Sequence, residues 1–307
     1  MIRKISISDL KKAVDEAYEK YKSIEKGEID PRLDNVDPKA FGISVMLADG
    51  TVINKGDTKV KSPLGHIANL AIHSLLLQQL GVKELVKKAG KVTNCALRAA
   101  DIPVCPHAVR AYSAVEPQND PDGKYDLIIN NILNMTGSAP NLDDKLYEKL
   151  VKEADDKQVV NKFAQADYTL YDDAEPSVRG FVKLEALQFT AEQIANFGAT
   201  IAADGVNPVT NTICYDGALS APLVTLAAIH GDADRNRRWL MKSGVPAVYS
   251  FGGLILAIMP GVGAIAAYAP AVGKHGRSKK GARAIRYITR ELGYNVFGSA
   301  RIEFVKD

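Results

Sequence analysis

The chain has 307 residues, of which 46% are hydrophobic and 24% are charged. This composition predicts a globular protein with a substantial buried core and excludes a disordered chain. The 39 basic and 36 acidic residues leave a formal net charge of +3 and are spread along the whole sequence. The charges therefore form no basic face, and the sequence does not predict a nucleic-acid partner.

Cysteine usage and hydropathy limit the cellular compartment. Cys95, Cys105 and Cys214 are too few and too scattered for a disulfide framework, and they form no CxxC pair that would hold zinc. The first residues lack the apolar segment of a signal peptide. The longest apolar stretch, residues 250–272, is interrupted by glycines and prolines, which predicts strand, turn and strand instead of a membrane helix. We expect a cytoplasmic protein that needs no cofactor.

The N-terminal part of the chain begins with a helix pattern. Residues 8–26 place their apolar side chains on one helical face. Residues 41–53 form two β-rich runs around an Asp-Gly pair, which predicts a hairpin. Ser62 followed by Pro63 is typical of an N-cap and the first helical position, so we expect a helix from there toward Gly81.

The second half of the chain contains both helix patterns and strand patterns. Residues 143–156 predict a charged helix, and Thr190 with Gln193 forms a capping box that opens an apolar helix. Residues 254–269 are two apolar runs around Pro-Gly, which predicts a second hairpin. Residues 278–292 carry an amphipathic helix pattern.

These elements predict an α+β fold. Because strands occur toward both chain ends, we expect the two hairpins to form a single antiparallel sheet packed with helices, with the helix that follows Ser62 beneath it. We expect one domain over residues 1–307, with a helical insert over about residues 85–185.

Three ordered blocks of sequence resemble one family. The first spans residues 29–57 and contains FGISV, DG and GD. The second, residues 197–210, reads FGATIA followed by GVNPVT. The third runs from GVPA at residue 244 to the Leu-Gly pair at residues 292–293. In this order and spacing they resemble the serine-dependent glutaminases, which have a serine β-lactamase-like fold, hydrolyse glutamine to glutamate and ammonia, and serve amino-acid metabolism.

The resemblance implies where the catalytic pair of that family would lie. In the family a serine and a lysine stand three residues apart on the first core helix, and the neutral lysine deprotonates the serine, which forms an acyl-enzyme. Counting forward from the GD pair without a gap places His66 at the serine position and Asn69 at the lysine position. Asparagine takes up no proton at neutral pH, so we expect a divergent member that lacks the pair.

The other pocket positions implied by the resemblance are also changed. Tyrosines of the family correspond to Glu28, Phe181 and Ala233, and a small valine whose backbone N–H helps to form the oxyanion hole corresponds to Phe251. The asparagine that holds the amino-acid end of the substrate corresponds to Asn130, which is retained. The family's glutamate and second asparagine have no clear counterpart within residues 143–165.

Two groups of histidine, asparagine and aspartate residues could form a site or could have ordinary structural roles. His66, Asn69 and His73 share one helix face, which fits either a replacement site with a general base or metal ligands, or one pocket histidine beside one packed histidine; we favour the packed histidine. Residues 230–234, HGDAD, border the pocket in this alignment, but aspartate-rich turns are common without metal. We expect no metal, and a cleft in which His66, Asn69 and Asn130 meet.

Two functions remain open from the sequence. The first is a glutaminase relative with a degenerate active site that binds a small amino-acid-like ligand, or a partner, without serine-based turnover. The alternative is an active amidohydrolase, a glutaminase or another hydrolase, that uses a group outside the family pattern such as His66. The resemblance further implies a homo-oligomer, and nothing in the sequence predicts a membrane partner.

Overall fold

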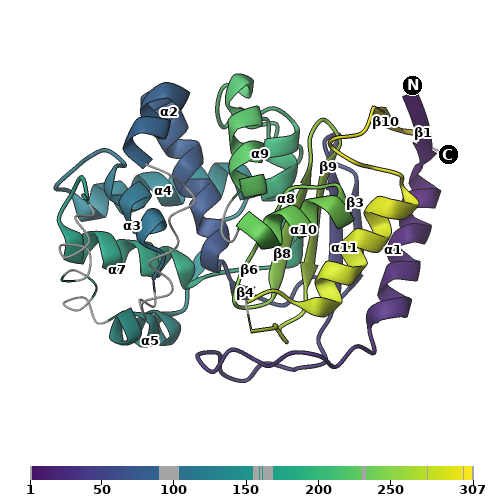
Figure 1. The fold of residues 1–307 in the computed structure, drawn as a ribbon, viewed down its shortest axis with the longest axis horizontal. Coiled ribbons are helices and arrows are strands. Elements are labelled where there is room, and N and C mark those ends of the chain that lie inside the picture. Colours follow the sequence, from purple (N-terminus) through teal and green to yellow (C-terminus); the bar gives the residue numbers. More distant parts are fainter. Residues whose placement is uncertain are drawn as a thin grey trace.

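A five-stranded antiparallel sheet lies at the centre of the right-hand part of the fold in Figure 1. Its strands, in the order β3-β2-β9-β8-β7, are β3 (Val52–Gly56), β2 (Gly42–Leu47), β9 (Gly263–Tyr268), β8 (Leu254–Met259) and β7 (Ala247–Tyr249). The N-terminal hairpin meets the C-terminal one where β2 pairs with β9, with Ile43 opposite Ala267. The predictions of both hairpins, of their union in one sheet, and of strand, turn and strand in the apolar stretch are confirmed.

The structure is a computed structural model that describes residues 2–89, 104–154, 159, 161, 169–229, 233–274, 276–299 and 301–305. Within these ranges no helix is both long enough and apolar enough to cross a lipid bilayer.

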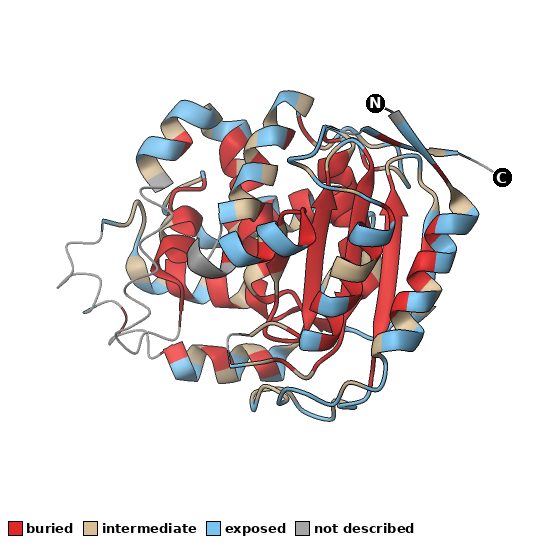
Figure 2. Cartoon of the chain, turned by 45° about the vertical axis from the view of Figure 1, so that its right-hand side comes forward, coloured by how far each residue is buried: buried red, intermediate tan, exposed pale blue. Residues whose placement is uncertain are grey.

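The two faces of the sheet are covered by different helices because successive strand residues point to opposite sides. Ile43, Val45 and Leu47 pack with α1 (Ile7–Tyr21) and α11 (Lys279–Glu291) on one face. Residues of the opposite register, such as Leu256 and Ala266, pack against α8 (Ala191–Ala202). The three central strands, β2, β9 and β8, are buried along their whole length, and Figure 2 shows them in red between partly exposed helices.

The helix beneath the sheet differs from the predicted one. We expected the helix after Ser62 in that place, but α8 occupies it, and α8 begins with the predicted capping box of Thr190 and Gln193. Ser62 is not an N-cap. It lies in the short strand β4 (Ser62–Pro63), and its hydroxyl donates to the carbonyl of Gly252 at 2.9 Å. A contact across the sheet edge therefore outweighs the local helix-start signal.

A mainly helical part packs beside the sheet, on the left in Figure 1. It contains α2 (Ala68–Ala89), α3 (Pro106–Ser113), α4 (Pro121–Thr136), α5 (Asp144–Ala154) and α7 (Ala174–Glu185). The predicted end of α2 near Gly81 corresponds to a break, because Gly81 has a φ of 70° before the helix resumes. The described helical elements also include α9 (Ser220–Ile229), α10 (Ala233–Ser243) and the 3-10 turn η3 (Gly217–Leu219).

The expectation of a single sheet is wrong. A parallel pair joins β1 (Ile2–Ser6) to β10 (Arg301–Val305), so the two chain ends lie side by side in Figure 1. A third sheet has the order β4-β6-β5, with β6 (Leu187–Phe189) and β5 (Asn141–Leu142). These strands are two to five residues long, too short to show a period in the sequence.

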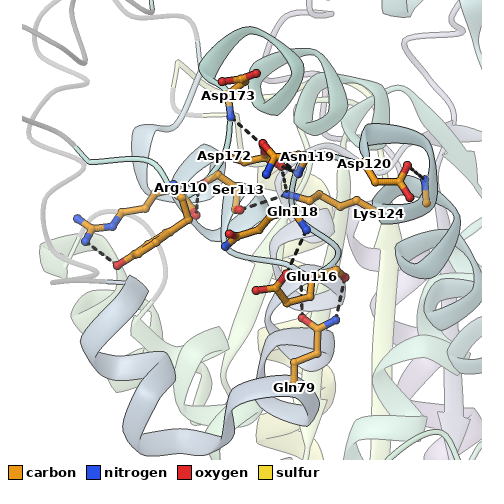
Figure 3. Close-up of polar contacts among 12 residues, drawn as sticks. Gln79, Arg110, Ser113, Glu116, Gln118, Asn119, Asp120, Lys124, Asp172 and Asp173 are labelled. Atoms are coloured by element: carbon orange, nitrogen blue, oxygen red, sulfur yellow. Dashed lines mark hydrogen bonds and ion pairs between the residues drawn. The ribbon is translucent and has the colours of Figure 1, made fainter.

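The helical part contains a buried ion pair, drawn in Figure 3. Lys124 Nζ, on α4, donates to Asp172 Oδ2 at 2.7 Å and to the Ser113 carbonyl at 3.1 Å. The Lys124 side chain is 1% exposed and that of Asp172 is 6% exposed. The backbone amides of Asn119 and Asp173 also donate to the Asp172 carboxylate. The pair therefore joins α4 to the last residue of α3, Ser113, and to the segment just before α7, which contains Asp172.

Candidate functional site

A 3-10 turn, η1 (Gly65–Ile67), places His66 where the sheet meets the helical part. This turn packs against β7 on one side and α7 on the other. Gly65 has a φ of 52°, and a Cβ there would lie 2.6 Å from Ser250 Oγ and 3.2 Å from a ring carbon of Phe251. Only glycine fits both the left-handed backbone and this close approach. The turn therefore holds the backbone of His66 against the segment that contains Phe251.

The side chain of His66 is hydrogen-bonded to a buried carboxylate. His66 Nδ1 lies 2.6 Å from Glu185 Oε1 at the end of α7. The Glu185 side chain is 5% exposed, whereas that of His66 is 22% exposed. A buried carboxylate is stable only with a hydrogen-bonded or charged partner, and the imidazole provides one. One side of the imidazole is thus fixed inside the protein while the ring as a whole remains within reach of solvent.

Glu185 was missed at the sequence level, although a signal for it exists. Val178, Phe181, Val182 and Glu185 follow the i, i+3, i+4, i+7 spacing of one helix face, and the structure buries all four. An acidic residue on an otherwise apolar face is the exception that points to a buried polar site.

Asn69 fixes His66 from the next turn of the chain. Its side-chain amide donates to the His66 carbonyl at 3.1 Å, and Asn69 itself is 1% exposed. His73 is also buried, its Nδ1–H donates to the Asn69 carbonyl at 2.6 Å, and its ring stacks on His107 with centroids 5.5 Å apart. His66 and His73 have different partners, and within the described residues no three metal-ligating side chains cluster. His73 is thus packed in the core, whereas His66 is partly exposed beside Glu185.

The burial of His73 predicts a pH-dependent stability. Burial lowers the pKa of the His73 imidazole from its ordinary value of 6.5, although the hydrogen bond to Asn69 opposes this. The folded state therefore keeps His73 neutral at a pH where the unfolded chain takes up a proton. The resulting stability is complete above pH 6.5 and is lost as the pH falls below it, by up to about 1.4 kcal/mol per pH unit.

Urea unfolding at pH 7.5 and at lower pH measures this effect. The wild type should lose free energy of unfolding between the two conditions, and the variant His73→Gln should lose less because one titrating group is gone. An equal loss in both proteins would contradict a neutral, buried His73.

Phe251 is covered by a guanidinium group. The Arg32 guanidinium lies 4.2 Å from the centre of the Phe251 ring, which is a cation–π distance. Arg32 also donates to both carboxylate oxygens of Asp30 at 2.7 Å, and its Nη1 lies 3.4 Å from Glu153 Oε2. Burial opposes the charge of Arg32, but Asp30, Glu153 and Glu185 raise the pKa of its guanidinium above the ordinary value. Arg32 is thus a permanent cation close to Glu185.

The Phe251 ring thus lies against both the Arg32 guanidinium and the Gly65 turn. The backbone N–H of Phe251 donates to no acceptor within the described part of the chain. A cleft of about 520 Å³ adjoins this region, with Arg32, Ser62 and Gly252 in its wall.

Asn130 does not join the site. Consecutive residues on a helix point about 100° apart, and on α4 it is Asn131 that faces α2, donating to the Ala71 carbonyl at 3.1 Å and to Ser74 Oγ at 2.6 Å. Asn130 is exposed. The expected meeting of His66, Asn69 and Asn130 is therefore corrected: the first two are joined, and the carboxylate of Glu185 is the third group.

The other positions that the resemblance assigned to the pocket do not join His66 in the described residues. Phe181 is fully buried in the core one turn before Glu185, so its ring offers no surface to a ligand. Glu28 is exposed and forms a two-residue bridge with Val272. The HGDAD segment falls at residues 230–234, of which 230–232 lie outside the described residues and the side chain of Ala233 is not described.

A family model described as Glutaminase matches residues 27–297. The chain belongs to the glutaminase family. A glutaminase from Parabacteroides distasonis is 32% identical to it over 320 aligned positions, which cover 99% of this chain and 100% of that protein.

Solved glutaminase structures share the fold. A probable glutaminase, ybaS, superposes with a TM-score of 0.85 at 23% identity and covers 96% of this chain and 100% of its own. A probable glutaminase from Bacillus subtilis, complexed with 6-diazo-5-oxo-L-norleucine, has a TM-score of 0.78 at 19% identity and covers 94% of each chain. The mixed α and β fold implied by the sequence blocks is thereby confirmed.

The relatives also correct one expectation about this glutaminase-family chain. We favoured a degenerate protein that binds a ligand without turnover. Proteins that are 32% identical along the full length bear the name of an active enzyme, so the alternative of an amidohydrolase fits better.

Proposed function

We propose that this protein is an amidohydrolase that converts glutamine and water to glutamate and ammonia. One observation carries the proposal: in a chain related along its whole length to glutaminases, His66 is partly exposed and hydrogen-bonded to the buried Glu185. The gap-free count along the sequence assigns this residue to the position of the family's nucleophile. A histidine held by a carboxylate is a group that enzymes use for proton transfer near neutral pH.

We also propose that hydrolysis does not use the serine and lysine of the family. In the gap-free alignment the two positions are His66 and Asn69. Asn69 directs its side-chain amide to the His66 carbonyl and has no basic group. The serines closest to the Gly65 turn are buried, and both hydroxyls already donate to backbone carbonyls: Ser62 to Gly252 and Ser250 to Pro63. Neither is disposed to act as a nucleophile.

Glutamine is the proposed substrate on the strength of the family, and a shorter amide provides the comparison. Asparagine presents the same amide one methylene closer to the amino-acid end. In a site that holds both ends, the loss of one methylene typically lowers kcat/KM by about 10–200-fold. We therefore expect glutamine to be preferred over asparagine by a factor in that range or larger.

The test is ammonia release by the purified full-length protein, measured with glutamine and with asparagine. The expected result is steady turnover of glutamine and formation of one glutamate per ammonia. Binding of glutamine, detected by calorimetry, without any release of ammonia would refute the proposed activity.

A further inference from the structure

The His66–Glu185 pair joins two segments that lie 119 residues apart in the chain. Glu185 comes from the last turn of α7, and His66 comes from the turn between β4 and α2. The resemblance implies a serine at the position of His66 and assigns no role to Glu185. The contact is short, at 2.6 Å, and the carboxylate is almost completely buried, so the pair is built into the interior and is not a surface ion pair.

The geometry defines which imidazole nitrogen can accept a proton. A carboxylate only accepts hydrogen bonds, so at 2.6 Å the Nδ1 of His66 carries the hydrogen. In the neutral ring the lone pair is then on Nε2. The same logic holds in the serine-histidine-aspartate triads of unrelated hydrolases, where a buried aspartate sets the tautomer and orientation of the histidine.

Three further contacts fix the position of the ring. The Asn69 amide holds the His66 carbonyl, the left-handed Gly65 holds the turn against Phe251, and η1 packs between β7 and α7. The charged groups described near the pair are Arg32, from the loop before β2, and Glu153, from α5. Arg32 is close enough to offset part of the negative charge of Glu185. The site is therefore preorganised before any ligand binds.

We propose that His66 is the general base of this enzyme, activating a water molecule directly, and that Glu185 is the residue that positions it. The inference rests on the proposed hydrolysis of glutamine and names the group that performs it. His66 replaces the family's nucleophile with a base, so that water itself is the nucleophile and no acyl-enzyme forms.

The reaction balances without any further reactant. Nε2 takes one proton from water while the water oxygen bonds to the amide carbon, and the C=O electron pair moves onto the oxygen. The imidazolium then gives its proton to the amide nitrogen. The C–N bond breaks, its electron pair leaves with the nitrogen as ammonia, and the C=O bond reforms in glutamate. The Phe251 N–H belongs to the segment that contacts the Gly65 turn, has no acceptor among the described residues, and is the group we assign to the transient oxyanion.

The pair itself is tested without turnover by proton NMR of the imidazole. The Nδ1–H of His66, donated to a carboxylate, should give a strongly downfield signal that disappears in His66→Ala and shifts upfield in Glu185→Gln. The same signal in Glu175→Gln, an exposed acid on the same helix α7, should be unchanged. If the signal persists in His66→Ala, the assignment of the pair is wrong.

The catalytic role is tested by kinetics. His66→Ala should lower kcat by about 10²–10⁴-fold, the usual contribution of a general base, with KM changed far less. Imidazole added to the solution should restore part of the activity, which a purely structural role of His66 would not produce. Glu185→Gln should lower kcat within the same range, because an amide can donate to Nδ1 and so favour the wrong tautomer; Glu175→Gln should match the wild type.

The outcomes separate this inference from the proposed function. A wild type that releases ammonia, together with an equally active His66→Ala variant, overturns the assignment of the base and leaves the glutaminase activity intact. A wild type that releases none refutes the activity, while the NMR signal still decides whether Glu185 holds His66. Circular dichroism and thermal unfolding of each variant verify that lost activity is not lost folding.

Discussion

Replacing Lys124 by methionine is expected to lower the free energy of unfolding by about 3–5 kcal/mol, the range for a buried ion pair that loses one partner. Methionine has a similar length and removes only the charge and the hydrogen bonds. The Asp172 carboxylate then stays buried without its main partner. The loss is a large part of the 5–15 kcal/mol that typically stabilises a domain.

The surroundings of Asp172 determine the direction of this effect. Burial would raise the pKa of its carboxyl, but the hydrogen bond from Lys124 and those from the Asp173 and Asn119 amides lower the pKa below the ordinary value of 3.8. The folded state thus stabilises the ionised form of Asp172. The stability that the ionised carboxylate contributes is present above pH 3.8 and is lost as the pH falls through the lowered pKa. Figure 3 shows the partners that would remain after Lys124 is removed.

Chemical unfolding of three variants measures the effect. Lys22→Met, which breaks an exposed ion pair with Glu19, is the matched control and should change the free energy by less than about 1 kcal/mol. The double variant Lys124→Met with Asp172→Asn should recover part of the loss, because the uncompensated charge is gone. A Lys124→Met protein as stable as the control would contradict the buried pair.

An electrophilic analogue of glutamine, such as 6-diazo-5-oxo-L-norleucine, is expected to leave every serine of this protein unmodified. The two serines beside the Gly65 turn donate their hydroxyls to backbone carbonyls, and Asn69 provides no base that could deprotonate them. Removing the nucleophile or the base from a cooperating unit typically eliminates nearly all of its covalent contribution. Labelling of serine should therefore be absent and not merely slow.

Intact-mass spectrometry and peptide mapping report the result. A glutaminase that retains the family's serine and lysine, treated in parallel, should gain one adduct per chain. An adduct on His66 would agree with the proposed base, because Nε2 then attacks the electrophile. A stoichiometric adduct on a serine would show that a serine route operates and that the alignment of residues 66–69 is wrong.

Much of the sheet could be predicted from the sequence because its signals are local. The two hairpins have apolar strands around Asp-Gly and Pro-Gly pairs, and the capping box of Thr190 and Gln193 marks the start of α8. Such features depend on a few neighbouring residues. The ordered glutaminase blocks then predicted the fold.

The site could be predicted only in part, because it depends on contacts between distant segments. The sequence placed His66 and Asn69, but the partner of His66 is 119 residues away, and only an acidic residue on a buried helix face points to it. Asn130 was chosen over its neighbour Asn131, and the orientation of α4 decides between them. Ser62 fitted an N-cap equally well until its bond to Gly252 was known.

Ammonia release from glutamine by the wild type and by His66→Gln, purified in parallel and assayed at the same pH, tests the central claim most directly. The claim predicts steady turnover by the wild type and a rate at least about a hundredfold lower for the variant, since the glutamine side chain has no basic nitrogen. Equal rates for the two proteins, or no release of ammonia by the wild type, would contradict it.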